Sequence, residues 1–434
     1  MRAVTTSEAA RRAIDAVWRI ESAKLIAGLT RLTGDIGTAE DLAQDALVAA
    51  LERWPETGVP DKPAAWLMAT AKHRAIDHFR RGKRIAEKHG QLSHELEAQQ
   101  EAAAPDLDAA LDDEIGDDLL RLVFTTCHPV LPVEARVALT LRLLGGLTTP
   151  EIARAFLVPE PTVAQRIVRA KRTLSEAKVP FEVPRGTELS ERLSAVLAVI
   201  YLVFNEGYSA TAGDDWMRPA LCDDALRLGR ILAGLMPAEP EVHGLVALME
   251  IQASRTAART GPGGEMILLL DQDRSRWDPL LIRRGLAALE QAQRLDGSRR
   301  PYTLQAAIAA CHARAATADA TDWPRIVALY DTLSEVAPSP VVDLNRAVAV
   351  AMALGPEAGL ALVDELTGVP ALKAYHLLPG VRGDLLMKLG RHAEAGAEFE
   401  RAASLTRNAR ERQLLLGRAS ECKALTAESQ SARN

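Results

Sequence analysis

The chain has 434 residues, of which 48% are hydrophobic, 25% are charged and only 4% are aromatic, and its formal net charge is −6. This length exceeds one ordinary hydrophobic core, so we expect two to four domains, and the abundance of Ala, Leu and Arg favours packed helices over sheets. No apolar run reaches the roughly 18 residues of a membrane span, and the charged N-terminus lacks the features of a signal peptide. The four cysteines lie far apart without metal-ligand spacing, which indicates free thiols in a cytoplasmic protein and excludes a disulfide or zinc framework.

The charges are distributed unevenly along the chain. Residues 1–90 hold 15 basic and 12 acidic side chains, and residues 119–180 hold 9 basic and 4 acidic ones. Between them, residues 91–118 hold 10 acidic side chains and no basic one. This distribution predicts two basic modules separated by an acidic tether that a polyanion would repel.

Helical periodicity dominates, and no convincing alternating strand pattern is present, so the fold class is predicted to be all-α. The first segment, 7–85, is predicted to form three or four helices separated by Gly- and Pro-containing breaks, one of them covering 63–81. In that helix, "WLMATAKHRAIDHFRRGKR", aromatic and cationic residues alternate, which suits single-stranded or melted DNA but also fits an ordinary solvated helix face.

Just upstream, "TAEDLAQDALVAALERW" places Glu40, Asp41 and Asp45 on one side of a helix. Like charges four residues apart repel each other mildly, so a basic protein partner would explain them. The positive end of the helix dipole would tolerate them as well. The pattern by itself leaves both explanations open.

The segment 118–178 contains a helix-turn-helix pattern, "TTPEIARAFLVPEPTVAQRIVRAKRTL". Thr148 or Thr149 can cap the first helix, whose buried side would hold Ile152, Ala153 and Phe156. In the second helix a buried stripe is predicted at Val163, Ile167, Ala170 and Leu174. The residues outside that stripe suit base edges and phosphates of a DNA major groove, although a solvated helix in an ordinary bundle would show the same pattern. They are Thr162, Gln165, Arg166, Arg169, Lys171 and Arg172.

The rest of the chain is predicted to be a helical extension in two parts, 187–290 and 300–425. "LGRHAEAGAEFERAASL" resembles the second helix of a tetratricopeptide repeat (TPR), and "WPRIVALYDTLSEVAPSPVVDLNRAVAVAMALG" gives a looser copy, which favours a stack of helical hairpins. "NEGYSATAGDDW" is predicted to be a loop with many hydrogen-bonding groups. "DQDRSRWD" is predicted to form a salt-bridge network at a helix start.

Taken together, the acidic helix, the basic aromatic helix, the acidic tether and the helix-turn-helix resemble a bacterial RNA polymerase sigma factor of the extracytoplasmic-function group (sigma-70 type, group IV). The resemblance covers about residues 10–178, and the extension resembles that of the subgroup with a long helical C-terminal region. It implies region 2 at 7–85, an acidic linker at 86–117, a region 4 helix-turn-helix at 118–178, and a TPR-like extension.

The same resemblance implies roles for individual residues. Core polymerase, through its β′ clamp helices, would bind Glu40, Asp41, Leu42 and Asp45. The −10 element would contact Trp66, Lys72, His73, Arg74, His78, Arg80 and Arg81. The −35 element would be read as duplex DNA by the outward face of the second helix, Thr162–Arg172, with the β flap as a further partner of the factor.

We therefore expect a cytoplasmic sigma factor without enzymatic activity, cofactor or metal, whose extension regulates it in cis by contacting the sigma domains or by holding another protein. Two other classes stay open from the residues alone. Asp214, Asp215, Asp271 and Asp273 could supply the paired carboxylates of a hydrolase, although no phosphate-binding Gly loop or metalloprotease motif accompanies them. A helical scaffold would explain only the extension.

Overall fold

The computed structural model describes residues 2–89, 111–156, 158–213, 216–262 and 265–431. Within these ranges the chain is predominantly helical with only two short strands, which confirms the predicted fold class. The chain divides into two compact units, residues 1–200 and residues 201–434, and each is described by itself below. The predicted acidic tether falls mostly outside the described residues.

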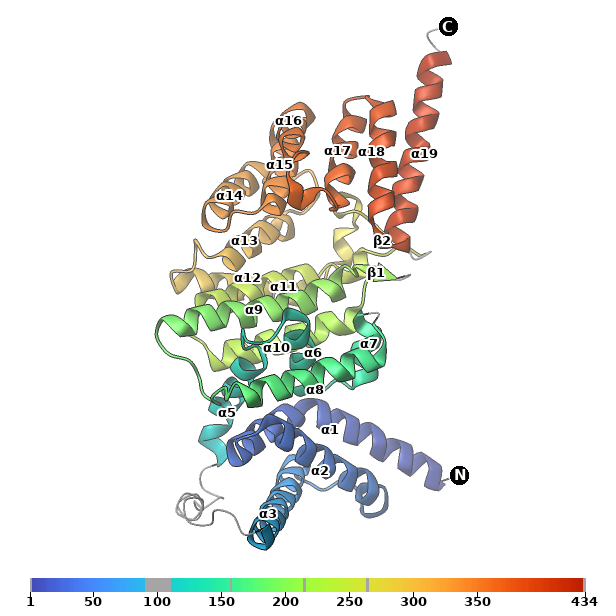
Figure 1. Cartoon of the computed structure of the whole chain (residues 1–434). Coiled ribbons are helices and arrows are strands. Elements are labelled where there is room, and N and C mark those ends of the chain that lie inside the picture. The colour runs from blue at the N-terminus through green and yellow to red at the C-terminus, as the bar shows by residue number, and fades with distance from the viewer. Residues whose placement is uncertain (1, 90–110, 157, 214–215, 263–264, 432–434) are drawn as a thin grey trace. The chain divides into compact units, whose positions relative to one another are not determined.

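The first half of unit 1 is a group of three helices, α1 (Arg2–Thr33), α2 (Ile36–Thr57) and α3 (Pro63–His89), each packed on the other two. Gly34 ends α1 with φ 67°, a backbone conformation that glycine adopts without steric cost. Asp35 then caps α2, because its carboxylate accepts from the Thr38 N–H at 2.7 Å. The tight turn makes α2 fold back on α1 (Figure 1).

The second half of unit 1 holds α5 (Leu111–Thr126), α6 (Val133–Leu143), α7 (Thr149–Phe156) and α8 (Glu160–Glu176). Its core includes Phe124 from α5 and Leu139 from α6, both fully buried. The beginning of α9 (Thr187–Tyr208) belongs to the same unit, since the buried Arg192 donates to the Phe124 carbonyl at 2.9 Å.

Unit 2 is a succession of helices, each packed on the next along the chain (Figure 1). They are α10 (Pro219–Leu235), α11 (Pro240–Ala253), α12 (Pro279–Arg294), α13 (Pro301–Arg314), α14 (Trp323–Val336), α15 (Pro340–Leu354), α16 (Pro356–Leu366), α17 (Leu377–Lys388), α18 (His392–Leu405) and α19 (Ala409–Ser431). Short 3-10 turns lie between some of them: η1 (Thr256–Ala258), η2 (Leu269–Asp271), η3 (Arg274–Arg276) and η4 (Pro370–Leu372).

The close approach of α17 and α18 shows why this region has the composition of a helical repeat. Phe399 of α18 is fully buried against Gly383 of α17, where an added Cβ would lie 2.8 Å from the Phe399 ring. Small residues therefore let the helices pack closely and bury the apolar stripe that each helix presents. The predicted stack of helical hairpins agrees with this arrangement.

Two short strands join distant parts of unit 2. β1 (Ala212–Gly213) pairs in parallel with β2 (Arg407–Asn408), and the buried Asn408 side chain donates to the Ala210 carbonyl at 3.2 Å. The segment after α9 is thus held against the start of α19. These strands are too short to produce an alternating pattern in the sequence.

Two local expectations were wrong in part. Residues 205–208 of the predicted "NEGYSATAGDDW" loop form the last turn of α9. "DQDRSRWD" does precede a helix, but Asp278 caps α12 by accepting from the Leu280 N–H at 2.8 Å, and Asp273 accepts from the Ser275 N–H at 2.9 Å. Helix caps and carbonyl contacts replace the predicted salt bridges.

The four cysteines are free thiols, as expected. Among the described helices, none combines the length and apolar character needed to cross a bilayer.

Candidate polymerase and promoter interface

Helix α2 carries the residues predicted to bind polymerase, but they lie on different faces. Asp41 and Asp45 are exposed, and the Asp45 carboxylate pairs with the Arg74 guanidinium of α3 at 3.2 Å. Leu42 is only 5% exposed and belongs to the core of unit 1. Glu40 is 4% exposed and faces the second half of the unit.

The outward face of α2 contains two residues that the sequence reasoning missed. Val48 is 48% exposed and Leu51 is 40% exposed, on the side of the helix that carries Asp41 and Asp45. These aliphatic side chains and the neighbouring carboxylates give this face both apolar area and negative charge. The departure from strict amphipathicity at these two positions is the sequence signal that could have identified them.

Helix α3 buries a narrow stripe of Leu67, Ala71 and Ala75. Ile76 of the same helix is 46% exposed. Trp66 is half-buried and meets Trp54 of α2 edge-on, with 5.4 Å between ring centroids. Its indole therefore packs against α2 and keeps only part of its surface open.

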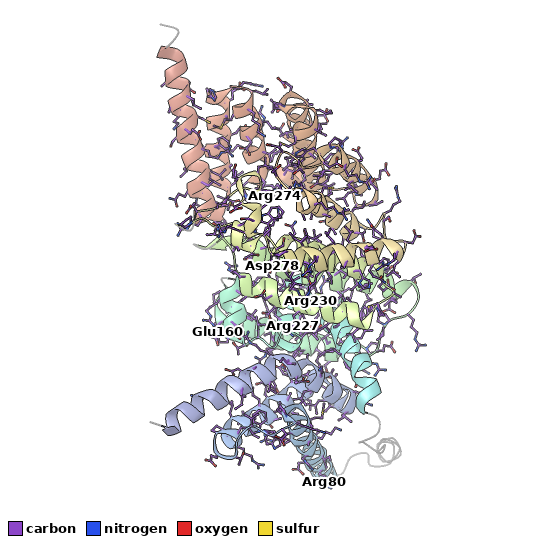
Figure 2. All side chains as sticks on the ribbon, turned by 180° about the vertical axis from the view of Figure 1, so that it is seen from behind. Arg80, Glu160, Arg227, Arg230, Arg274 and Asp278 are labelled. Carbon is purple, nitrogen blue, oxygen red and sulfur yellow. The ribbon has the colours of Figure 1, made fainter. Side chains whose placement is uncertain are left out.

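The cationic residues of α3 lie beside that stripe. His73 and Arg80 are exposed, whereas Lys72 and Arg74 are half-buried. Figure 2 shows Arg80 on this helix. The side chains of His78, Phe79 and Arg81 lie outside the described residues.

The helix-turn-helix forms as predicted, and its first helix has a reciprocal cap. The Thr148 N–H donates to Glu151 at 2.8 Å, while the Glu151 N–H donates to the Thr148 hydroxyl at 3.3 Å. Burial opposes ionisation of Glu151, but the hydrogen bonds from Thr148 and the charge of Arg19 outweigh it and lower the pKa of Glu151. Of the predicted buried side, Ile152 and Ala153 are buried, whereas Phe156 is half-buried.

The second helix, α8, buries the four predicted positions and turns a polar face outward. The buried residues are Val163, Ile167, Ala170 and Leu174. On the outward face, Gln165, Arg169 and Arg172 are exposed, while Thr162 and Arg166 are half-buried. Val168 lies among these polar groups and is 64% exposed, so its apolar side chain is open to contact with a partner of the helix.

Lys171 departs from this outward face. Its ammonium forms an ion pair with the carboxylate of Glu40, and its side chain is 19% exposed. The same carboxylate accepts from Arg142 of α6 at 2.7 Å. A residue predicted to bind polymerase and a residue predicted to bind DNA are thus paired with each other.

Further ion pairs connect the two halves of unit 1. Arg19 of α1 lies 3.0 Å from Glu151 at the start of α7, and Arg31 of α1 lies 2.9 Å from Asp118 of α5. Asp118 is 3% exposed, so this pair is largely screened from solvent. The packing of the two halves therefore depends on charge complementarity as well as on apolar contact.

Comparison with known families assigns both halves. The model of sigma-70 region 2 matches residues 21–85, and that of sigma-70 region 4 matches residues 121–174. A family of unknown function, DUF6596, matches residues 192–293. The exposed faces of α2, α3 and α8 described above lie within the two sigma regions.

Relatives of known name agree with this assignment. The chain is 33% identical to the ECF RNA polymerase sigma factor SigL of Mycobacterium tuberculosis over 146 residues, covering 33% of this chain and 76% of SigL. It is 28% identical to the probable ECF RNA polymerase sigma factor SigI of the same species over 172 residues, covering 39% of this chain and 57% of SigI. An uncharacterized protein of Rhizobium meliloti is 46% identical over 386 residues, covering 88% of this chain and 89% of that protein. No solved structure matches.

Two helical modules that match regions 2 and 4 define a sigma-70 type transcription factor. The chain belongs to the extracytoplasmic-function group of that family and carries a C-terminal extension that includes the DUF6596 region. It is a promoter-directing sigma factor, and the hydrolase and scaffold alternatives are not favoured. In the described part of the chain, no three His, Cys, Asp or Glu side chains are grouped so as to hold a metal ion.

Proposed function

We propose that this sigma factor binds core RNA polymerase through the exposed face of α2 and opens and reads its promoter through α3 and α8. It acts in the cytoplasm and performs no covalent chemistry of its own. The observation that carries this proposal is the presence, within one compact unit, of an acidic-aliphatic face and two cationic faces on helices that match sigma regions 2 and 4.

The polymerase-binding face comprises Asp41, Asp45, Val48 and Leu51. Its carboxylates suit a basic partner and accelerate association, while its two aliphatic side chains bury apolar area on binding. Leu42 supports this face from the core, because it is buried beneath the helix and has no surface to offer a partner.

The −10 element is proposed to bind α3. A separated strand exposes base faces that stack on aromatic rings and phosphates that attract cations. Trp66 and His73 supply rings at one end of the helix, and Lys72, Arg74 and Arg80 supply charge along it. The predicted contributions of His78 and Arg81 belong to the same proposal.

The −35 element is proposed to bind α8 as duplex DNA. Arg166 and Arg169 lie one turn apart and can reach purine edges bidentately, while Gln165 suits an adenine edge. Thr162 and Arg172 would contact phosphates. The β flap of polymerase is the further protein partner expected for this half.

The contact between the two halves has a consequence for these roles. Glu40 and Lys171 cannot reach polymerase and DNA while they are paired with each other. The arrangement of unit 1 is therefore proposed to be a resting one that separates on binding core polymerase, which releases both residues. Because Arg142 also pairs with Glu40, separation would expose two cations in region 4 and raise its affinity for DNA.

The extension is proposed to regulate this transition in cis. It is net acidic, with 32 acidic against 28 basic residues over 181–434, whereas the sigma modules are net basic. An acidic partner close to cationic DNA-binding faces lowers their affinity for phosphate in a salt-dependent way.

Run-off transcription with purified core polymerase tests the proposal. The full chain is compared with fragments that end at Lys178 and at Ile200, because Arg192 belongs to the packed core of unit 1 and the shorter fragment removes it. We expect selective transcripts with the full chain and a changed output with the fragment ending at Ile200. A full chain that neither binds core polymerase nor confers start-site selection would overturn the proposal.

A further inference from the structure

Three arginines and three aromatic residues from separate segments meet in unit 2. We call them the arginine cluster: Arg255, Arg259, Arg274, Tyr208, Trp216 and Trp277. Tyr208 ends α9, the first two arginines flank η1, and Arg274 begins η3. The two motifs "NEGYSATAGDDW" and "DQDRSRWD", which the sigma function does not use, both contribute to it.

The first part of the cluster is a stack on Tyr208. The Arg259 guanidinium lies 3.4 Å from the centroid of the Tyr208 ring and 4.5 Å from that of Trp216. The Arg255 guanidinium lies 5.7 Å from the same Tyr208 centroid. One phenol ring is thus shared by two cations.

The second part is a similar arrangement around Trp277. The guanidinium of Arg255 lies 5.8 Å from the centroid of the Trp277 ring, and that of Arg274 lies 4.8 Å from it. Arg255 therefore stands between the two rings and links the three cations. Cation–π contacts hold the guanidinia in place but leave their net charge uncompensated.

The cluster has no carboxylate partner among the described residues. Arg259 donates to the Tyr208 carbonyl at 2.5 Å, and Arg274 donates to the Ala315 carbonyl at 2.8 Å and to the His312 carbonyl. Arg255 donates to the Gln252 side chain. Neutral oxygens orient these guanidinia without neutralising them.

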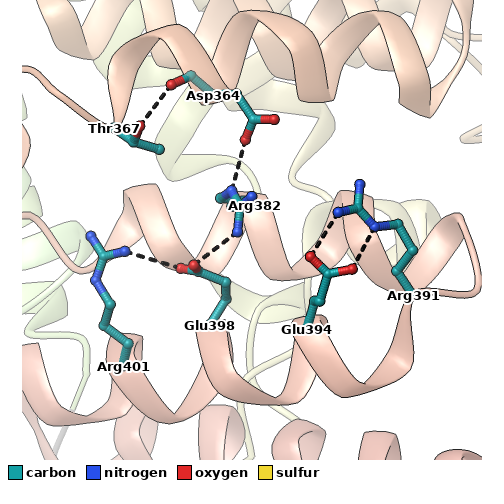
Figure 3. A network of polar contacts seen from close by, with 7 residues as sticks. All are labelled: Asp364, Thr367, Arg382, Arg391, Glu394, Glu398 and Arg401. Carbon is teal, nitrogen blue, oxygen red and sulfur yellow. Dashed lines mark hydrogen bonds and ion pairs between the residues drawn. The ribbon is translucent and has the colours of Figure 1, made fainter.

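Other arginines of unit 2 show the contrast. Arg382 bridges two carboxylates (Figure 3), and its guanidinium lies 2.8 Å from Asp364 and 2.9 Å from Glu398. Arg230 likewise pairs with the buried Glu250 at 2.8 Å. Charges that leave water are ordinarily paired in this way, so the arginine cluster is exceptional.

The electrostatic consequence appears in the neighbouring groups. Burial, together with the charge of Arg255, lowers the pKa of Arg259 to about 10. Burial, followed by the charges of Arg255 and Arg274, lowers the pKa of His312 to about 4. These groups lie in a positive and poorly hydrated environment that would favour a bound anion.

Three buried polar atoms at this place also lack a hydrogen-bond partner in the described structure: Arg255 Nε, Trp277 Nε1 and His312 Nδ1. Trp277 is only 5% exposed, whereas Arg255 and His312 are half-buried. Arg255 Nε and Trp277 Nε1 can only donate a hydrogen bond. An acceptor supplied by a ligand would satisfy them.

We propose that the arginine cluster binds the phosphate group of a small molecule. Guanidinia match phosphate oxygens in geometry and charge, and three of them offer more donors than the two oxygens of one carboxylate accept. The site lies in the region that matches DUF6596, and all six of its residues belong to unit 2. It gives the extension a ligand whose binding can be measured without polymerase.

Isothermal titration calorimetry on the full chain tests the site, with inorganic phosphate and adenosine monophosphate as separate probes at constant ionic strength. We expect saturable binding of at least one probe, and the comparison distinguishes free phosphate from a phosphorylated metabolite. Arg255→Gln should weaken binding about tenfold or more, since it removes a charge-assisted contact. Arg255→Lys keeps the charge but loses the planar guanidinium. Its affinity for the probe should therefore lie between those of the wild type and Arg255→Gln.

Two control variants locate the binding. Arg294→Gln removes an exposed charge from α12, where the guanidinium already pairs with Glu290 at 3.0 Å, and should bind phosphate like the wild type. A chain carrying Arg166→Ala and Arg169→Ala should also bind normally, which separates the site from the DNA-binding face. Far-UV circular dichroism establishes that each variant is folded.

Three results would overturn the proposal: no saturable binding of either phosphate probe, equal affinity in the wild type and a folded Arg255→Gln chain, or loss of binding in the Arg166→Ala, Arg169→Ala chain with retention in Arg255→Gln. Binding of malonate without binding of phosphate would overturn the ligand class. None of these outcomes depends on sigma activity, so failure here is distinct from failure of the proposed function.

Discussion

The carboxylate of Glu40 lies 2.7 Å from the Arg142 guanidinium and thereby joins α2, the helix proposed to bind polymerase, to the half of unit 1 proposed to read promoter DNA. Its second oxygen pairs with Lys171 of α8. Glu40 is 5% exposed at its side chain, whereas each cation is 19% exposed. One buried anion thus holds two cations from α6 and α8.

Glu40→Gln should destabilise unit 1. The change leaves Arg142 and Lys171 without an anionic partner in a place that water reaches poorly, and breaking such a pair costs about 3 kcal/mol. The midpoint of thermal unfolding should fall by several degrees. Glu52→Gln, at an exposed position of the same helix, is the matched control, and an equal midpoint in both variants would show that the contact contributes little.

Replacing Arg166 and Arg169 with Ala should abolish protection of the −35 element while leaving capture by core polymerase intact. Both residues lie on the outward side of α8, and each lost base contact costs about 1–3 kcal/mol. Footprinting of the assembled holoenzyme measures protection. Arg185→Ala removes an exposed charge outside the helix and should leave protection unchanged. Undiminished protection in the double variant would contradict the duplex-reading role of this face.

Asp41→Lys together with Asp45→Lys should weaken capture by core polymerase. The exchange replaces two exposed carboxylates of the proposed binding face with positively charged ammonium groups, which repel a basic partner. It also removes the carboxylate that pairs with Arg74. A pull-down titration with purified core polymerase measures the loss, which should slow association most strongly at low salt. Asp319→Lys, at an exposed position of the extension, controls for net charge. Equal capture of both variants would remove the assignment.

Stability should depend on the protonation of His312. The pKa of this residue is lowered to about 4 by burial and by Arg255 and Arg274, whereas in the unfolded chain it is about 6.5. Below about pH 6.5 the unfolded chain therefore binds a proton that the folded chain does not. As the pH is lowered from about 6.5 to about 4, the free energy of unfolding should therefore fall by up to about 1.4 kcal/mol per pH unit.

Urea unfolding at several pH values between about 7 and 5 measures this slope. His312→Gln should show a shallower decline than the wild type, because Gln cannot take up a proton in the unfolded chain. Parallel curves for wild type and His312→Gln would contradict the assigned direction of the pKa shift.

The helices and their buried faces were largely predictable from the sequence. Val163, Ile167, Ala170 and Leu174 recur at helical spacing, and all four are buried in α8. Such a pattern is local, because a helix repeats every 3.6 residues and its apolar stripe must face a core. The same local signals identified the cap at Thr148.

Local patterns failed where a side chain has two plausible environments. Lys171 was predicted to lie with the outward cations of α8, yet it pairs with Glu40. Leu42, for which the family resemblance implied a polymerase contact, has its side chain in the core. The helical period specifies the angle of a side chain around its helix but not which neighbouring element that side chain will meet.

The sequence alone thus determined the all-helical class, the helix-turn-helix and the outward arginines of its second helix, because each depends on residues within a few turns of one another. Only the tertiary structure revealed the pairing of Glu40 with Arg142, residues that lie 102 positions apart. It alone also brought Arg255, Arg259 and Arg274 around shared aromatic rings. Contacts of this kind arise from how helices pack, and no periodicity along the chain encodes which charges will be buried together.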